Sequence, residues 1–132
     1  WFPVASAMPR MLRELSMDEG AGFLGFELLL GAHGPYVVQY WATLEQLYAY
    51  ASAPKQEHHP AWTRFNRMAR KAPGAVGIWH ETFVVERAES IYVSTPLMGL
   101  PKATESVPIR RHHDRAHARM SDGRTVGATP VS

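Results

Sequence analysis

The stretch at residues 23–41 reads FLGFELLL, then GAHGP, then YVVQYW, and it decides the class of fold. Its first part is an apolar run with one acidic residue, Glu27, and its last part is β-branched and aromatic, a composition that favours strands. The Gly/Pro segment between the two parts is typical of a turn. The sequence therefore predicts a β-hairpin with strands at residues 23–30 and 36–41.

Helices are expected on both sides of this hairpin. Apolar residues recur at helical spacing through residues 7–17, with Ser6 as the N-cap. After the hairpin, Thr43 and Gln46 have the spacing of a capping box, which indicates the start of a second helix. A third helix is predicted over residues 57–71.

Two further strands are predicted at residues 76–85 and 90–95, where β-branched and aromatic residues recur. The resulting order of helix, strand, strand, helix and strand is that of an α+β, ferredoxin-like antiparallel sheet with helices on one face and its first strand missing. Residues 1–4 are too short, and too interrupted by Pro3, to supply that strand. We expect an apolar segment upstream of Trp1 to supply it in the native protein.

Length and composition indicate one ordinary globular domain. The chain has 132 residues and a mass of 14.8 kDa, with 45% apolar and 20% charged residues. It has no Cys, which excludes disulfides, thiolate metal sites and Cys nucleophiles. The longest apolar stretch is too short to span a bilayer, and no signal peptide is evident, so we expect a cytoplasmic protein without membrane contact.

The basic charge is concentrated at one end of the chain. Residues 101–132 hold six Lys and Arg against three acidic residues, whereas residues 1–100 hold eight against nine. This pattern predicts a domain at 1–100 followed by a basic, flexible C-terminal tail at 101–132. A body with negative net charge makes a poor phosphate-binding surface, so no nucleic-acid partner is expected. The tail histidines, His112, His113 and His117, are expected to be flexible and not a metal cluster.

Three groups of segments together carry a resemblance to a known family. They are WFPV at 1–4 with Met8-Pro9, then VQYW at 38–41 with HHPAWTRFN at 58–66, and GIWHETF at 77–83 with IYV at 91–93 and Gly99-Leu100. The chain resembles the small bacterial and fungal family labelled "monooxygenase family protein", whose members resemble the dimeric α/β-barrel superfamily. The resemblance covers about residues 1–101 and implies a homodimer. Exposed sheet residues such as Tyr40, Val38, Ile78 and His80 would be covered in that dimer.

The chain also has a distant similarity to the haem-containing aldoxime dehydratases. Those enzymes pair a helical His, which ligates haem iron, with a later His-Glu on a strand that handles a proton. The similarity implies that haem b is bound through His58 or His59, and that His80 is the catalytic residue. The Ser and Arg that those enzymes take from an upstream region have no counterpart in this chain.

Helical geometry separates the two adjacent histidines. One apolar stripe consists of His58, Trp62, Phe65 and Ala69. A polar stripe about 100° away consists of His59, Thr63, Asn66 and Arg70. Because a porphyrin is largely apolar, His58 is the predicted metal ligand, with His59 as the alternative. The other predicted cofactor-binding residues are Trp62, Phe65 and Tyr40, and without haem His58 is a histidine at the edge of the core.

His80 is placed by the alternation of the predicted strand. Ile78, His80 and Thr82 share one face, and Glu81 lies on the other, so a His–Glu dyad is not expected. Histidine changes its charge between about pH 5 and 8, which suits it to acid–base catalysis on a cavity-lining face.

Three functions are consistent with the sequence. The first is a haem-dependent enzyme, a lyase or a monooxygenase, acting on a small, mostly apolar substrate such as one with an N–O bond. The second is a cofactor-independent monooxygenase-like enzyme in which His80 acts as a base. The third is a non-catalytic ligand-binding or dimerisation module.

Overall fold

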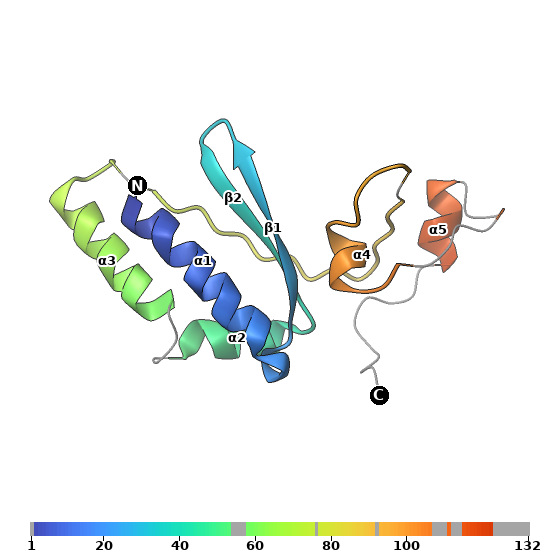
Figure 1. Ribbon diagram of the computed structural model, residues 1–132, viewed down its shortest axis with the longest axis horizontal. Coiled ribbons are helices and arrows are strands. Elements are labelled where there is room, and N and C mark those ends of the chain that lie inside the picture. Colours follow the sequence, from blue (N-terminus) through green and yellow to red (C-terminus); the bar gives the residue numbers. More distant parts are fainter. Residues whose placement is uncertain are drawn as a thin grey trace. The chain divides into compact units, whose positions relative to one another are not determined.

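The computed structural model describes residues 2–53, 58–75, 77–91, 93–106, 111 and 115–122, and for residues 2–7, 58–62, 64 and 122 it describes the backbone alone. Figure 1 shows the elements, which in chain order are α1 (Phe2–Met17), the 3-10 turn η1 (Glu19–Ala21), β1 (Phe23–Gly31), β2 (Gly34–Trp41), α2 (Leu44–Ser52), α3 (His58–Lys71), α4 (Leu100–Ala103) and α5 (Ala116–Asp122). The chain forms two compact units. We call Trp1–Phe23 with Thr43–Thr82 the helical unit, and Leu24–Ala42 with Phe83–Ser132 the hairpin unit.

The core of the helical unit lies along α1, which packs side by side with α3 (Figure 1). Leu12 and Leu15 are three residues apart, so they lie on the same face of the helix. Their side chains are only 1% and 2% exposed, and they are the most deeply buried among the described residues. Burying two leucines on one helical face stabilises this unit through the hydrophobic effect.

Helix α1 begins earlier than the sequence pattern predicts. It starts at Phe2, whereas the pattern places the start at Ala7 with Ser6 as N-cap, and that prediction is wrong. Pro3 is compatible with the longer helix because the first-turn N–H groups have no partner within a helix. Pro9 lies inside the helix, where it removes one backbone hydrogen bond without ending the helix.

Helix α2 begins at the predicted capping box. The Thr43 hydroxyl oxygen accepts a hydrogen bond from the Gln46 backbone N–H at 3.1 Å. The same hydroxyl donates to the Gln46 side-chain oxygen at 3.1 Å, so the two residues bond reciprocally. This arrangement confirms Thr43 as the N-cap and satisfies one of the free donors at the helix start.

The turn before β1 depends on a glycine. The Asp18 carboxylate accepts a hydrogen bond from the Gly20 N–H at 3.1 Å and caps η1. Gly22 follows with φ of 76°, a left-handed conformation that side-chain-bearing residues rarely adopt. A Cβ at Gly22 would also overlap the side chain of Gln46.

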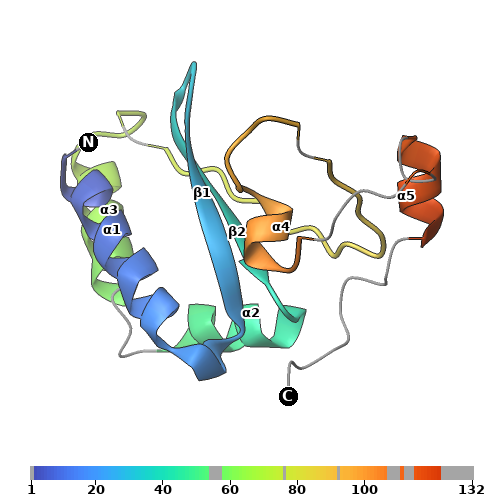
Figure 2. The same ribbon diagram turned by 45° about the vertical axis from the view of Figure 1, so that its right-hand side comes forward.

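Strands β1 and β2 form the predicted hairpin, a two-stranded antiparallel sheet (Figure 2). Ala32 and His33 connect the strands in a two-residue turn. The strands are slightly longer than predicted, because Gly31 and the Gly34-Pro35 pair join the ladder. Together with the helices they confirm the predicted α+β class, and their order along the chain is compatible with a ferredoxin-like fold.

The strands predicted at residues 76–85 and 90–95 do not form among the described residues of those ranges. Val76 and Tyr92 lie outside the described part of the structure. The described residues between 77 and 98 contain no helix or strand, and Phe83 and Val84 are 77% and 78% exposed. A β-branched composition favours extended backbone, but a strand also needs a neighbour to pair its N–H and C=O groups.

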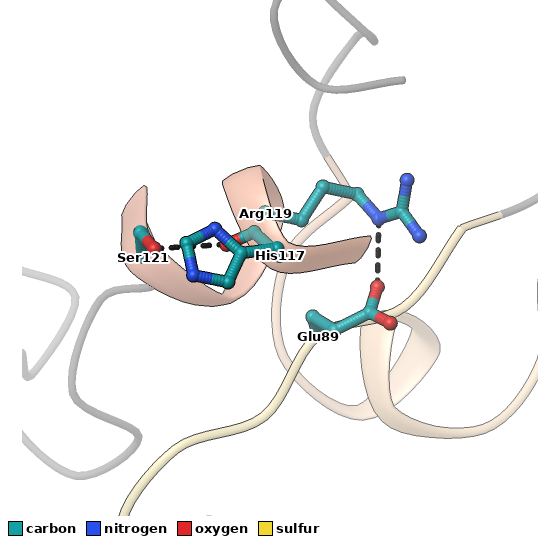
Figure 3. Close-up of polar contacts among 4 residues, drawn as sticks. All are labelled: Glu89, His117, Arg119 and Ser121. Carbon is teal, nitrogen blue, oxygen red and sulfur yellow. Dashed lines mark hydrogen bonds and ion pairs between the residues drawn. The ribbon is translucent and has the colours of Figure 1, made fainter. Parts of the chain in front are cut away.

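Residues beyond 100 contribute α4 and α5 to the hairpin unit. Arg119 on α5 donates from its Nε to Glu89 at 2.7 Å, and the two side chains are 14% and 22% exposed (Figure 3). On the same helix the Ser121 hydroxyl donates to the His117 carbonyl at 2.9 Å (Figure 3). A charge-assisted pair that is largely shielded from water links α5 to the segment around Glu89.

Among the helices of the described residues, none combines the length and apolarity needed to cross a bilayer.

Candidate functional site

The predicted haem-binding residues occupy the first half of α3. The backbone of His58, His59 and Trp62 is helical, and their side chains lie outside the described part of the structure. Phe65 is half-buried on the same helix. Haem ligation by His58 or His59 therefore stays a prediction.

His80 lies in an extended segment of the helical unit, and its side chain is exposed. The prediction that it lines a sheet face beside Ile78 is wrong for this structure, because no strand forms there. Ile78 and Trp79 are 49% and 67% exposed, so the imidazole has apolar groups directly before it in an accessible segment. A molecule that reaches this segment can contact the His80 imidazole, an acid–base group, and the apolar side chains of Ile78 and Trp79 that precede it.

Tyr40 belongs to a cluster that joins the hairpin to α4. The carboxylate of Glu27 on β1 accepts a hydrogen bond from the Gly99 backbone N–H at 2.6 Å. A Cβ placed on Gly99 would lie 3.5 Å from the Tyr40 hydroxyl, and one on Gly25 would lie 3.4 Å from Cβ of Ala103. These five residues form the hairpin–α4 cluster, and Figure 2 shows α4 beside the hairpin.

The cluster positions α4 through the part-buried hydrogen bond between Gly99 and Glu27. Gly99 has φ of 65° and precedes the helix as its N-cap, so its N–H points away from the helical ladder and is available to Glu27. A bond from an N–H to a carboxylate is charge-assisted and therefore stronger than a bond between neutral groups. Tyr40, half-buried beside this bond, supplies an aromatic ring and a hydroxyl at the same end of the hairpin.

Glu27 is the residue of this cluster that the sequence analysis left without a role. The available signal was its position as the one acidic residue in an otherwise apolar strand. A carboxylate in such a run needs a hydrogen-bond donor, because burying an unpaired charge is costly. The donor is 72 residues away along the chain, so the sequence pattern could not identify it.

Replacing Glu27 with alanine is expected to release α4 from the hairpin. The Gly99 N–H would lose its acceptor, and its amide hydrogen exchange, measured by NMR, would accelerate by about tenfold. Glu86→Ala, a change at an exposed carboxylate of the same unit, is the matched control and should leave that rate unchanged. Equal exchange rates at Gly99 in the wild type and Glu27→Ala would contradict the positioning role.

Within the described ranges, no group of three or more His, Cys, Asp or Glu side chains is arranged to hold a metal ion. His117 is exposed on α5, and the other two tail histidines, His112 and His113, lie outside the described residues.

The described elements have an α+β architecture that is compatible with a ferredoxin-like fold. Residues 1–100 match the family described as Monooxygenase af470-like. Because this match covers most of the chain, the protein belongs to the monooxygenase af470-like family.

No curated protein and no solved structure matches the chain. The predicted resemblance to a monooxygenase family is confirmed. The similarity to haem-containing aldoxime dehydratases receives no support from the comparisons.

Proposed function

We propose that the protein is a monooxygenase-like enzyme that acts on a small, electron-rich, mostly apolar molecule without a bound cofactor. The observation that carries this proposal is membership of the monooxygenase af470-like family over residues 1–100, a range that contains His80 and Tyr40. The exposed imidazole of His80 supports it, because a base must reach the proton that it removes.

The proposed reaction begins when the His80 imidazole takes a proton from an activated C–H group of the substrate. The electron pair left on carbon reduces molecular oxygen, and a C–O bond forms. The O–O bond then breaks, so that one oxygen atom stays on the substrate as a carbonyl. The other oxygen leaves as water with the two hydrogens that the substrate loses, which balances the reaction. Ile78 and Trp79 supply apolar contact for the substrate beside the base.

Anthrone is a suitable probe because its CH₂ group lies between two aromatic rings and is readily deprotonated. One anthrone and one O₂ give one anthraquinone and one water. We expect the purified, colourless protein to consume oxygen and form anthraquinone in a one-to-one ratio, with no change on addition of a chelator. An inactive, colourless protein would contradict the proposal. A red protein with a Soret band, whose turnover is lost when haem is removed, would instead support the predicted haem-dependent enzyme.

We also propose that the protein forms a homodimer through the apolar surface of the hairpin unit. The exposed apolar side chains of this unit include Leu28 (56%), Leu29 (48%), Leu30 (88%), Phe83 (77%), Val84 (78%) and Val93 (74%). These exposed apolar side chains all belong to one compact unit, and large exposed apolar areas commonly mark interfaces. Isolated hairpins are marginally stable, so a second copy covering this surface would stabilise the unit.

Light scattering of the full chain at micromolar concentration is expected to give the mass of two copies. Leu30→Lys together with Val84→Lys should shift it to the mass of one copy, because charges would be buried in the interface. Met17→Lys, at an apolar residue of the helical unit that is 76% exposed, is the matched control. A monomeric wild-type protein would contradict the dimer.

A further inference from the structure

The polar stripe of α3 borders an open depression with a volume of about 410 Å³. Its lining residues are Thr63, Asn66, Ala69 and Arg70. They recur at spacings of three and four, which places them on one face of the helix. None of these residues belongs to the hairpin–α4 cluster or to the segment around His80.

Among the described residues, the lining is rich in hydrogen-bond donors and contains no carboxylate. Thr63 contributes a hydroxyl, Asn66 an amide and Arg70 a guanidinium, while Ala69 adds an apolar methyl group. The whole of α3 contains no acidic residue, and its last turn carries Arg70 and Lys71. A negatively charged ligand would therefore meet no repulsion from the helix that forms this surface.

The two strongest donors of the lining are not engaged by other described side chains. Neither the Arg70 guanidinium nor the half-buried Asn66 amide forms a hydrogen bond or an ion pair within the described part of the chain. They are four residues apart on one helical face, so both can reach the same ligand. A guanidinium has the planar, two-pronged geometry that matches a carboxylate.

We propose that the α3 depression binds a small organic carboxylate. Arg70 holds the carboxylate, Asn66 donates a further hydrogen bond to it, and Ala69 contacts the apolar part of the molecule. The volume of the depression lies in the range of about 300–1,000 Å³ that is typical of small-molecule sites. This inference does not depend on the proposed oxygenase activity.

Benzoate is the probe for this site, titrated into the full chain at low ionic strength and followed by NMR shifts of the α3 amides. Arg70→Gln is expected to weaken benzoate binding by about tenfold or more, since it removes the charge and the two-pronged contact. Asn66→Ala is expected to weaken it by about threefold. Arg67→Gln is the matched control, because Arg67 is exposed on the same helix but does not line the depression, and it should change the affinity less than twofold.

Four results would overturn the proposal. The first is the absence of saturable benzoate binding by the wild-type protein, and the second is an equal loss in Arg67→Gln and Arg70→Gln, which would indicate a general positive field. The third is equal affinity for the neutral analogue benzamide. The fourth is tighter binding of inorganic phosphate, which would assign the site to phosphate. Circular dichroism of each variant shows that the comparison is made between folded proteins.

Discussion

We expect His80→Ala to lower anthrone turnover by about 10²–10⁴-fold, the range that a positioned general base contributes. The imidazole is the proposed acceptor of the substrate proton, and alanine has no group that can replace it. The variant is expected to fold normally, because the His80 side chain is exposed and lies outside helices and strands. Oxygen uptake and anthraquinone formation measure the loss, and circular dichroism verifies the fold.

His33→Ala is the matched control for this experiment. His33 is an exposed histidine in the turn between β1 and β2, so its removal deletes the same group without touching the segment around His80. It should retain full turnover. Equal losses in the two variants, or full activity of His80→Ala, would contradict a catalytic role for His80. Added imidazole that restores part of the His80→Ala activity would identify the missing group as a base.

Leu15→Ala is expected to lower the free energy of unfolding by about 2–5 kcal/mol. The side chain is 2% exposed on α1, which packs against α3, so its truncation leaves a cavity in the core of the helical unit. Single domains are stable by only about 5–15 kcal/mol, so this loss is a large fraction of the total. Urea denaturation followed by helical circular dichroism measures it.

Met17→Ala provides the comparison on the same helix. Met17 ends α1 and is 76% exposed, so removing its side chain should change the free energy of unfolding by less than about 0.5 kcal/mol. If the two variants were destabilised equally, Leu15 would not belong to the core of the helical unit.

The sequence analysis predicted Tyr40 as a haem-binding residue, and that role stays a prediction. The structure places its hydroxyl beside Gly99, whose backbone N–H donates to the Glu27 carboxylate. Glu27 was missed because its partner is remote in the chain. His80 was identified by residue type and by resemblance, but the strand predicted to carry it is absent from the described residues.

The sequence by itself determined the elements whose stabilising contacts are local. The Thr43–Gln46 capping box joins residues three positions apart, and the β1–β2 hairpin closes over the two-residue turn at Ala32-His33, so short-range patterns identify both. Such contacts require little loop-closure entropy and depend on residues that are neighbours in the chain.

Only the tertiary structure decided the features that depend on distant partners. The Glu27–Gly99 bond joins residues 72 apart, and the Arg119–Glu89 pair joins residues 30 apart, so no local pattern contains either one. The segment after Gly77 has the composition of a strand, yet it forms none because its backbone groups lack a neighbouring strand among the described residues. Local propensity limits what a segment can become, and the partners that pair its polar groups decide which of those structures forms.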